Sequence, residues 1–143
     1  MDEKDKRILN VLKENSKLST QQISKRVSIP ITTVHHRIKR LEKDGVIERY
    51  SVVLNPKKTG KMISSYISII VDYRYTKQSQ HEMAKNLKSK DVVEDVAIVT
   101  GSTDMIIKVR VKDMDELNEF VIKYLRMLDG VERTETLVIL HEA

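Results

Sequence analysis

The 143-residue sequence contains no cysteine, no tryptophan, one phenylalanine, two prolines and four glycines. Without cysteine the chain can form neither disulfides nor thiolate metal sites, and it has no thiol nucleophile. The low glycine and proline content excludes a collagen-like or low-complexity chain, and a hydrophobic fraction of 40% is too high for a disordered one. We therefore expect a globular chain with one domain of usual size or two small ones.

Long apolar runs are missing as well. The chain is charged from Asp2 onward, so its start lacks the apolar core of a signal peptide. The longest apolar-looking stretch, residues 66–75, is interrupted by Asp72 and Arg74 and is much shorter than the roughly 18 residues of a membrane span. We expect a soluble cytoplasmic protein with no membrane partner.

Charge is distributed unevenly along the chain. Residues 1–60 carry 14 Lys and Arg against 7 Asp and Glu, whereas residues 61–143 carry 12 against 14. The net charges of +7 and −2 indicate that the first module meets a polyanion and the second does not. On charge alone, a solvated basic surface explains the asymmetry equally well. The turn-forming residues 55–60 place the domain junction near Gly60.

The first module is predicted to contain three helices. Asp2 can cap the first, and Ser19 forms a capping box with Gln22 at the start of the second. A third helix is expected over residues 31–44, between the break at Pro30 and a glycine stop. A short helix, a tight turn and a long basic helix together indicate a helix-turn-helix.

The third helix has one apolar edge, formed by Val34, Ile38 and Leu41, and an outward face of hydrogen-bond donors. Such a helix would enter a DNA major groove, with threonine and histidine near base edges and the basic side chains on phosphates. The alternative is a three-helix protein-interaction domain. Residues 46–54 are expected to follow as a strand or ribbon. The candidate DNA-binding residues are Thr32, Thr33, His35, His36, Lys39, Arg40 and Lys43.

The second module is predicted to have the order β-α-β-β-α-β. The first strand alternates through residues 63–75, so that Tyr73 and Tyr75 continue its apolar face, and the helix that begins after Asp113 has the most regular apolar spacing in the chain. The fold class is therefore α+β, with a winged helix-turn-helix over residues 1–60 and a ferredoxin-like domain over residues 61–143. Two helices on one sheet face leave the other face uncovered, which predicts an oligomer.

Two segments, in this order of modules, make the chain recognisable. The end of the helix-turn-helix, IKRLEKDGVI (residues 38–47), and TGSTDMIIKVRVKDMDEL (residues 100–117) resemble the Lrp/AsnC family of feast/famine transcription regulators. The resemblance spans essentially the whole chain. It implies dimers packed through their open sheet faces, further assembly to tetramers or octamers, and a roughly palindromic duplex DNA site. Where relatives often have Ser-Pro, this chain has Pro30-Ile31, which offers no side-chain cap.

The turn at residues 101–104 is the candidate effector site. Gly101 lacks a side chain, so a ligand can approach the backbone there, and N–H groups in a tight turn can hold a carboxylate. Asp104 can accept from an ammonium group. The resemblance implies an amino-acid ligand in a cleft between dimers; the alternative is ordinary turn chemistry. The candidate effector-binding residues are Gly101, Ser102, Thr103, Asp104, Thr134 and Thr136.

Other functions have little support in the sequence. The adjacent His35 and His36 cannot share a metal ion, so neither a metal nor another cofactor is expected. A nucleophile elbow, a phosphate loop and a dinucleotide motif are all missing, which leaves a small ferredoxin-like hydrolase as a weak alternative. An RNA-binding sheet would need exposed aromatics, and Phe120 lies on a helix. We expect a sequence-specific DNA-binding regulator modulated by an amino acid; the runner-up is an architectural or constitutive regulator without an effector.

Overall fold

The computed structural model describes residues 1–142, and its chain divides into two compact units. The division lies between Val53 and Leu54. The sequence predicts the junction several residues later, near Gly60. Each unit has a hydrophobic core of its own. No helix within residues 1–142 has the length and apolar character needed to cross a membrane.

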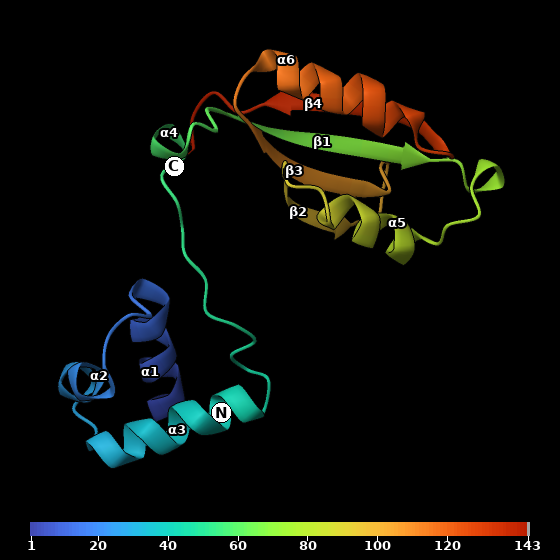
Figure 1. Cartoon of the computed structure of the whole chain (residues 1–143). Coiled ribbons are helices and arrows are strands. Elements are labelled where there is room, and N and C mark those ends of the chain that lie inside the picture. The colour runs from blue at the N-terminus through green and yellow to red at the C-terminus, as the bar shows by residue number, and fades with distance from the viewer. Residues whose placement is uncertain (143) are drawn as a thin grey trace. The chain divides into compact units, whose positions relative to one another are not determined.

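The N-terminal unit consists of α1 (Glu3–Glu14), α2 (Thr20–Val27) and α3 (Ile31–Lys43) (Figure 1). The predicted caps are confirmed: the Asp2 and Ser19 side chains cap α1 and α2, and α3 begins without a side-chain cap. The left-handed conformation of Ser28 ends α2 and turns the chain toward α3 within three residues. The three helices pack around the buried side chains of Ile8, Leu12, Ile23, Val27, Ile29 and Val34.

The predicted strand over residues 46–54 is wrong. This segment has no regular secondary structure, and the side chains of Val52 and Val53 are exposed. A strand is stable only when a neighbour takes its backbone hydrogen bonds, and no strand within residues 1–142 pairs with this one. The turn predicted over residues 55–60 contains the short helix α4 (Pro56–Thr59), which Asn55 caps.

The C-terminal unit has the predicted β-α-β-β-α-β order. Its strands are β1 (Ile63–Val71), β2 (Val93–Ile98), β3 (Met105–Val111) and β4 (Val131–Val138), with α5 (Gln80–Lys88) between β1 and β2. The strands lie in the order β2-β3-β1-β4 and all neighbours are antiparallel, which confirms the ferredoxin-like topology.

One face of the sheet is covered by both helical segments, as expected. Ile67 and Ile69 of β1 and Ile107 of β3 point toward this face and are fully buried with Leu87 of α5 and Leu125. The opposite face of the sheet, which we call the open face, has no helix over it in the described chain (Figure 1).

Two details of the sequence prediction for this unit are wrong. Strand β1 ends at Val71, and the residues Tyr73–Tyr75 form a 3-10 turn because the Asp72 side chain accepts the Arg74 N–H. The helix after Asp113 is also not regular: α6 (Met114–Asn118) continues as a π-helical segment over 119–124 and a 3-10 turn over 125–127. The apolar residues of this segment still face the sheet, because packing in the core keeps them there although the helical winding changes along the segment.

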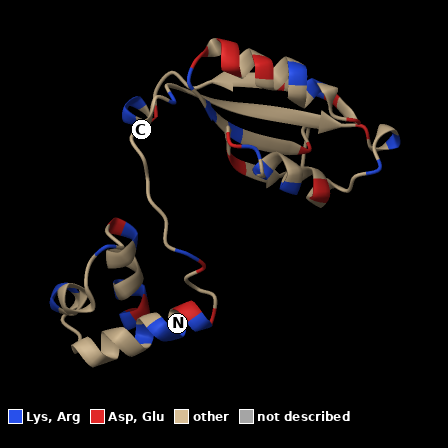
Figure 2. Cartoon of the chain, viewed as in Figure 1, with Lys and Arg blue, Asp and Glu red and all other residues tan. Residues whose placement is uncertain are grey.

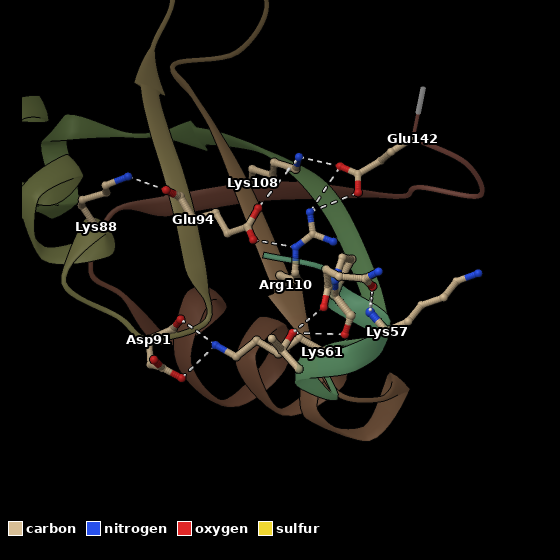
Figure 3. Close-up of polar contacts among 11 residues, drawn as sticks. Lys57, Lys61, Lys88, Asp91, Glu94, Lys108, Arg110 and Glu142 are labelled. Carbon is tan, nitrogen blue, oxygen red and sulfur yellow. Dashed lines mark hydrogen bonds and ion pairs between the residues drawn. The ribbon is translucent and has the colours of Figure 1, made fainter. Parts of the chain in front are cut away.

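The open face carries a cluster of paired charges at one end (Figure 3). Lys108 Nζ lies 2.6 Å from a Glu142 carboxylate oxygen, and Arg110 bonds both Glu142 and Glu94. The side chains of Lys108 and Arg110 are largely covered. Glu142 pairs with both basic side chains, and its bond to Lys108 is the main reason why the pKa of Lys108 is raised.

Candidate functional site

Helix α3 has the two-sided character that the sequence predicts. Val34 and Leu41 are buried and Ile38 is half-buried, whereas Thr32 and His36 on the opposite side are exposed. The N-terminal half of the helix carries no charge, and its basic residues lie in the C-terminal half (Figure 2). A neutral, donor-bearing start followed by a basic end suits base contacts near the first turns and phosphate contacts beyond them.

The candidate phosphate-binding side chains differ in their partners. Lys39 is 67% exposed, and its Nζ lies 3.4 Å from Glu42 on the same helix. Such an exposed pair holds the lysine only weakly, so a phosphate can replace the carboxylate. Lys43 is also exposed. Arg40 instead contacts α1, where its Nη2 lies 2.8 Å from Asp5 Oδ2.

A four-residue ion cluster joins the start of α1 to the middle of α3, and the sequence analysis missed it. Arg37 Nη1 lies 2.7 Å from both Asp2 oxygens and 2.8 Å from Asp5 Oδ1. Asp2 and Asp5 also form the capping box of α1. The one feature of the sequence that points to this cluster is the position of Asp5 one turn before Ile8, on the buried side of α1.

The cluster keeps both carboxylates ionised. The Arg37 guanidinium, followed by the Asp5 backbone N–H, holds the pKa of Asp2 well below its usual range. Burial acts to raise the pKa of Asp5, but the Asp2 backbone N–H and the Arg37 guanidinium outweigh it, and the pKa ends below the ordinary value. Neither carboxylate is protonated near neutral pH, so the pairing with Arg37 and Arg40 is maintained.

The turn at residues 101–104 is tied to the end of β1. Asp104 Oδ2 accepts the Val71 N–H at 2.8 Å, and the Thr103 hydroxyl donates to the Ile69 carbonyl at 2.9 Å. Gly101 has a φ of 113°, and a side chain there would meet no other atom within 4 Å. Thr103 and Asp104 therefore shape the turn, while the backbone at Gly101 stays open to a ligand.

A shallow groove of about 310 Å³ runs from this turn over the open face, between β1 and β4. Thr134 and Thr136 do not line it, because they pair with Ile69 and Ile67 and so point to the helix-covered face. Side chains along a strand alternate between its two faces, so the β4 residues that line the groove are those that point to the open face. Its lining residues are Ser68, Ile70, Ser102, Thr103, Arg133, Glu135 and Leu137.

Arg133 and Glu135 are the groove residues that the sequence analysis missed. They bring a guanidinium and a carboxylate to the same wall, which is the charge pair that complements a zwitterion. The signal that could have found them is the two-residue period of β4, once its pairing with β1 is known.

Comparison with known families covers both units. Residues 1–48 match the profile of a winged helix-turn-helix DNA-binding domain, and residues 65–143 match that of the Lrp/AsnC ligand binding domain. The HTH-type transcriptional regulator FL11 of Pyrococcus furiosus is 36% identical over 140 residues, covering 98% of this chain and 89% of the relative. An uncharacterised HTH-type transcriptional regulator of Pyrococcus horikoshii is 36% identical over 139 residues, covering 97% and 85%.

Solved structures agree along the whole chain. A transcriptional regulator of Neisseria meningitidis, solved as its complex with L-Met, matches with a TM-score of 0.89 and 26% identity, covering 99% of this chain and 91% of that one. AsnC of Escherichia coli matches with a TM-score of 0.81 and 26% identity, covering 99% and 93%.

Proposed function

Because the chain belongs to the Lrp/AsnC family of transcriptional regulators, we propose that it binds duplex DNA through the outward face of α3 and responds to an amino acid bound on its C-terminal unit. The family consists of regulators and not of enzymes, in agreement with the expected absence of catalysis. A DNA partner also supports the expected cytoplasmic location. The exposed, donor-bearing face of α3 opposite its buried stripe is the observation that carries the DNA-binding proposal.

In this proposal the residues of α3 divide by task. Thr32, Thr33, His35 and His36 lie at the uncharged start of the helix and contact base edges. Lys39, Arg40 and Lys43 contact phosphates, which position the helix without reading sequence.

Replacement of Lys39 by Ala tests the DNA interface. We expect weaker binding to every duplex and a salt dependence whose slope falls by about 1, because one phosphate contact is lost. Fluorescence anisotropy with a labelled mixed-sequence duplex, titrated at several salt concentrations, measures both quantities. Lys123→Ala is the matched control, since Lys123 is 74% exposed and pairs with Glu119 on its own helix as Lys39 does with Glu42. If both variants bind with the wild-type affinity and slope, the interface is assigned wrongly.

We further propose that the effector is an α-amino acid in the groove beside the 101–104 turn. The L-Met complex of the Neisseria regulator supports this class of ligand. Backbone N–H groups of the turn that Gly101 opens and the Arg133 guanidinium suit the carboxylate, and Glu135 suits the ammonium group. A ligand in this groove, which lies on the same open face as the expected contact between copies, would couple binding to assembly and so to the arrangement of two α3 helices on DNA.

Calorimetry against the twenty amino acids tests the effector. We expect heat of binding with one amino acid or a small related set, and a loss of affinity of about tenfold or more in Arg133→Gln, since a charged hydrogen bond to the carboxylate is removed. Arg126→Gln is the matched control, because Arg126 contacts Thr134 on the other side of the sheet. Silence across all twenty amino acids favours the runner-up, a constitutive or architectural regulator without an effector.

A further inference from the structure

A buried carboxylate lies beneath the proposed DNA-binding helix. The Asp5 side chain has no exposed surface, and its two oxygens lie 2.8 Å from Arg37 Nη1 and 2.8 Å from Arg40 Nη2. Asp5 Oδ2 also accepts the Asp2 backbone N–H at 2.9 Å. A carboxylate that is fully buried and accepts three hydrogen bonds through its two oxygens cannot change its position without loss of several bonds, so it is a rigid anchor for both arginines.

The two arginines use this anchor differently. Arg37 is 19% exposed and pairs with Asp2 as well as with Asp5, so its positive charge is neutralised within the domain and is not available to a phosphate. Arg40 is 52% exposed, and its bond to Asp5 through Nη2 is the one that its guanidinium makes within residues 1–142. A guanidinium has five N–H donors in one plane, so most of those on Arg40 have no partner among residues 1–142, and about half of this side chain is accessible to solvent.

We propose that Asp5 is a positioning residue for DNA binding: it holds the Arg40 guanidinium in one orientation, with its unused N–H edge directed at a DNA phosphate beside the groove that α3 enters. The inference rests on the proposed function of α3. A long side chain that is already fixed loses less rotamer entropy on binding, and the planar fork can bond a carboxylate and a phosphate on different edges at once. An ammonium group is a point charge and has no such second edge.

Asp5→Asn tests this inference because simple electrostatics and positioning predict opposite results. Removal of a negative charge near a polyanion should tighten binding, whereas loss of the anchor should weaken it. We expect affinity for a mixed-sequence duplex to fall about tenfold and the salt slope to fall by about 1. Arg40→Gln should give the same slope, and the double variant should lose no more, because both changes remove one contact.

Asp2→Asn is the matched control. It removes a carboxylate of the same cluster that contacts Arg37 and not Arg40, and Asn remains a good helix cap. We expect it to keep the wild-type slope. Circular dichroism and denaturant titration of each variant report how much protein is folded under the binding conditions, so that a loss of affinity that only follows the unfolded fraction overturns the inference.

Arg40→Lys tests the inference without change at the buried position. It keeps the charge but lacks the second edge, so an ammonium group held by Asp5 has no free edge for the phosphate, and we expect affinity to fall several-fold and the salt slope to fall by up to about 1. Wild-type affinity in Asp5→Asn or in Arg40→Lys overturns the role of Asp5 while duplex binding by the wild type stands. Absence of duplex binding by the wild type overturns both the proposed function and the inference.

Discussion

Gly130 occupies a position where two constraints coincide. Its φ of 87° lies in the left-handed region, and a Cβ there would lie 2.8 Å from Cβ and Cγ2 of Thr76. Its carbonyl also accepts the Asp72 N–H at 2.7 Å. The turn that precedes β4 therefore packs directly on the turn that follows β1, and any side chain at residue 130 would separate them.

Gly130→Ala should lower the free energy of unfolding by about 2–4 kcal/mol, because backbone strain adds to overpacking. Urea unfolding followed by circular dichroism measures the loss. Gly60→Ala is the control: its φ of 76° is similar, but nothing lies within 4 Å of the added Cβ, so about 1 kcal/mol is expected from backbone strain alone. Equal losses of unfolding free energy in the two variants would show that the contact with Thr76 does not contribute to the destabilisation.

At the scale of elements, the open face of the sheet is the feature that needs a partner. Tyr66 and Leu137 are exposed on it, and Ile70 and Ile106 are half-buried beside them. The cluster of Lys108, Arg110, Glu94 and Glu142 is satisfied within the chain, so burial of the end of the face that carries this cluster would leave none of these four charges unpaired. An apolar strip beside paired charges fits a second copy of the same chain.

We expect light scattering at micromolar concentration to give a dimer or a larger assembly, and Leu137→Glu to shift it toward the 16.6 kDa monomer, because a charge would be buried unpaired. Ile122→Glu is the control on the helix-covered side, where an exposed apolar residue of similar size lies outside the open face. A stable monomer in the wild type would remove both this interface and the argument for a palindromic operator.

At the scale of the whole molecule, the excess of basic over acidic residues lies in the part of the chain that carries α3. Residues 1–60 have a net charge of +7 and residues 61–143 one of −2, so attraction to DNA belongs to the part of the chain that carries α3, and assembly can be left to the remainder. This division supports a regulator in which a symmetric assembly presents two copies of α3.

A dimer with two copies of α3 should protect two inverted half-sites about 10 bp apart, centre to centre. Selection of bound duplexes from a random pool, followed by footprinting, measures the spacing and the symmetry. A single asymmetric half-site, protected by protein that light scattering shows to be dimeric, would contradict the palindrome.

The sequence by itself determined the three helices of the first unit and the order of strands and helices in the second. Helix caps at Asp2 and Ser19 depend on residues three positions apart, and the buried stripe of α3 and the alternation of β3 depend on helical and strand periods. Such patterns are local, so they can be found along the chain. The family resemblance added the function that these elements serve, and matches to both domain profiles agree with it.

Only the tertiary structure decided which distant residues meet. Asp5 bonds Arg37 and Arg40 across 32 and 35 positions, and Arg133 reaches the groove only because the register of β4 on β1 points it there. The strand predicted over residues 46–54 did not form, because no strand in the described chain pairs with it. Long-range pairing depends on how elements pack, and a two-residue period cannot tell which face of a strand will be covered.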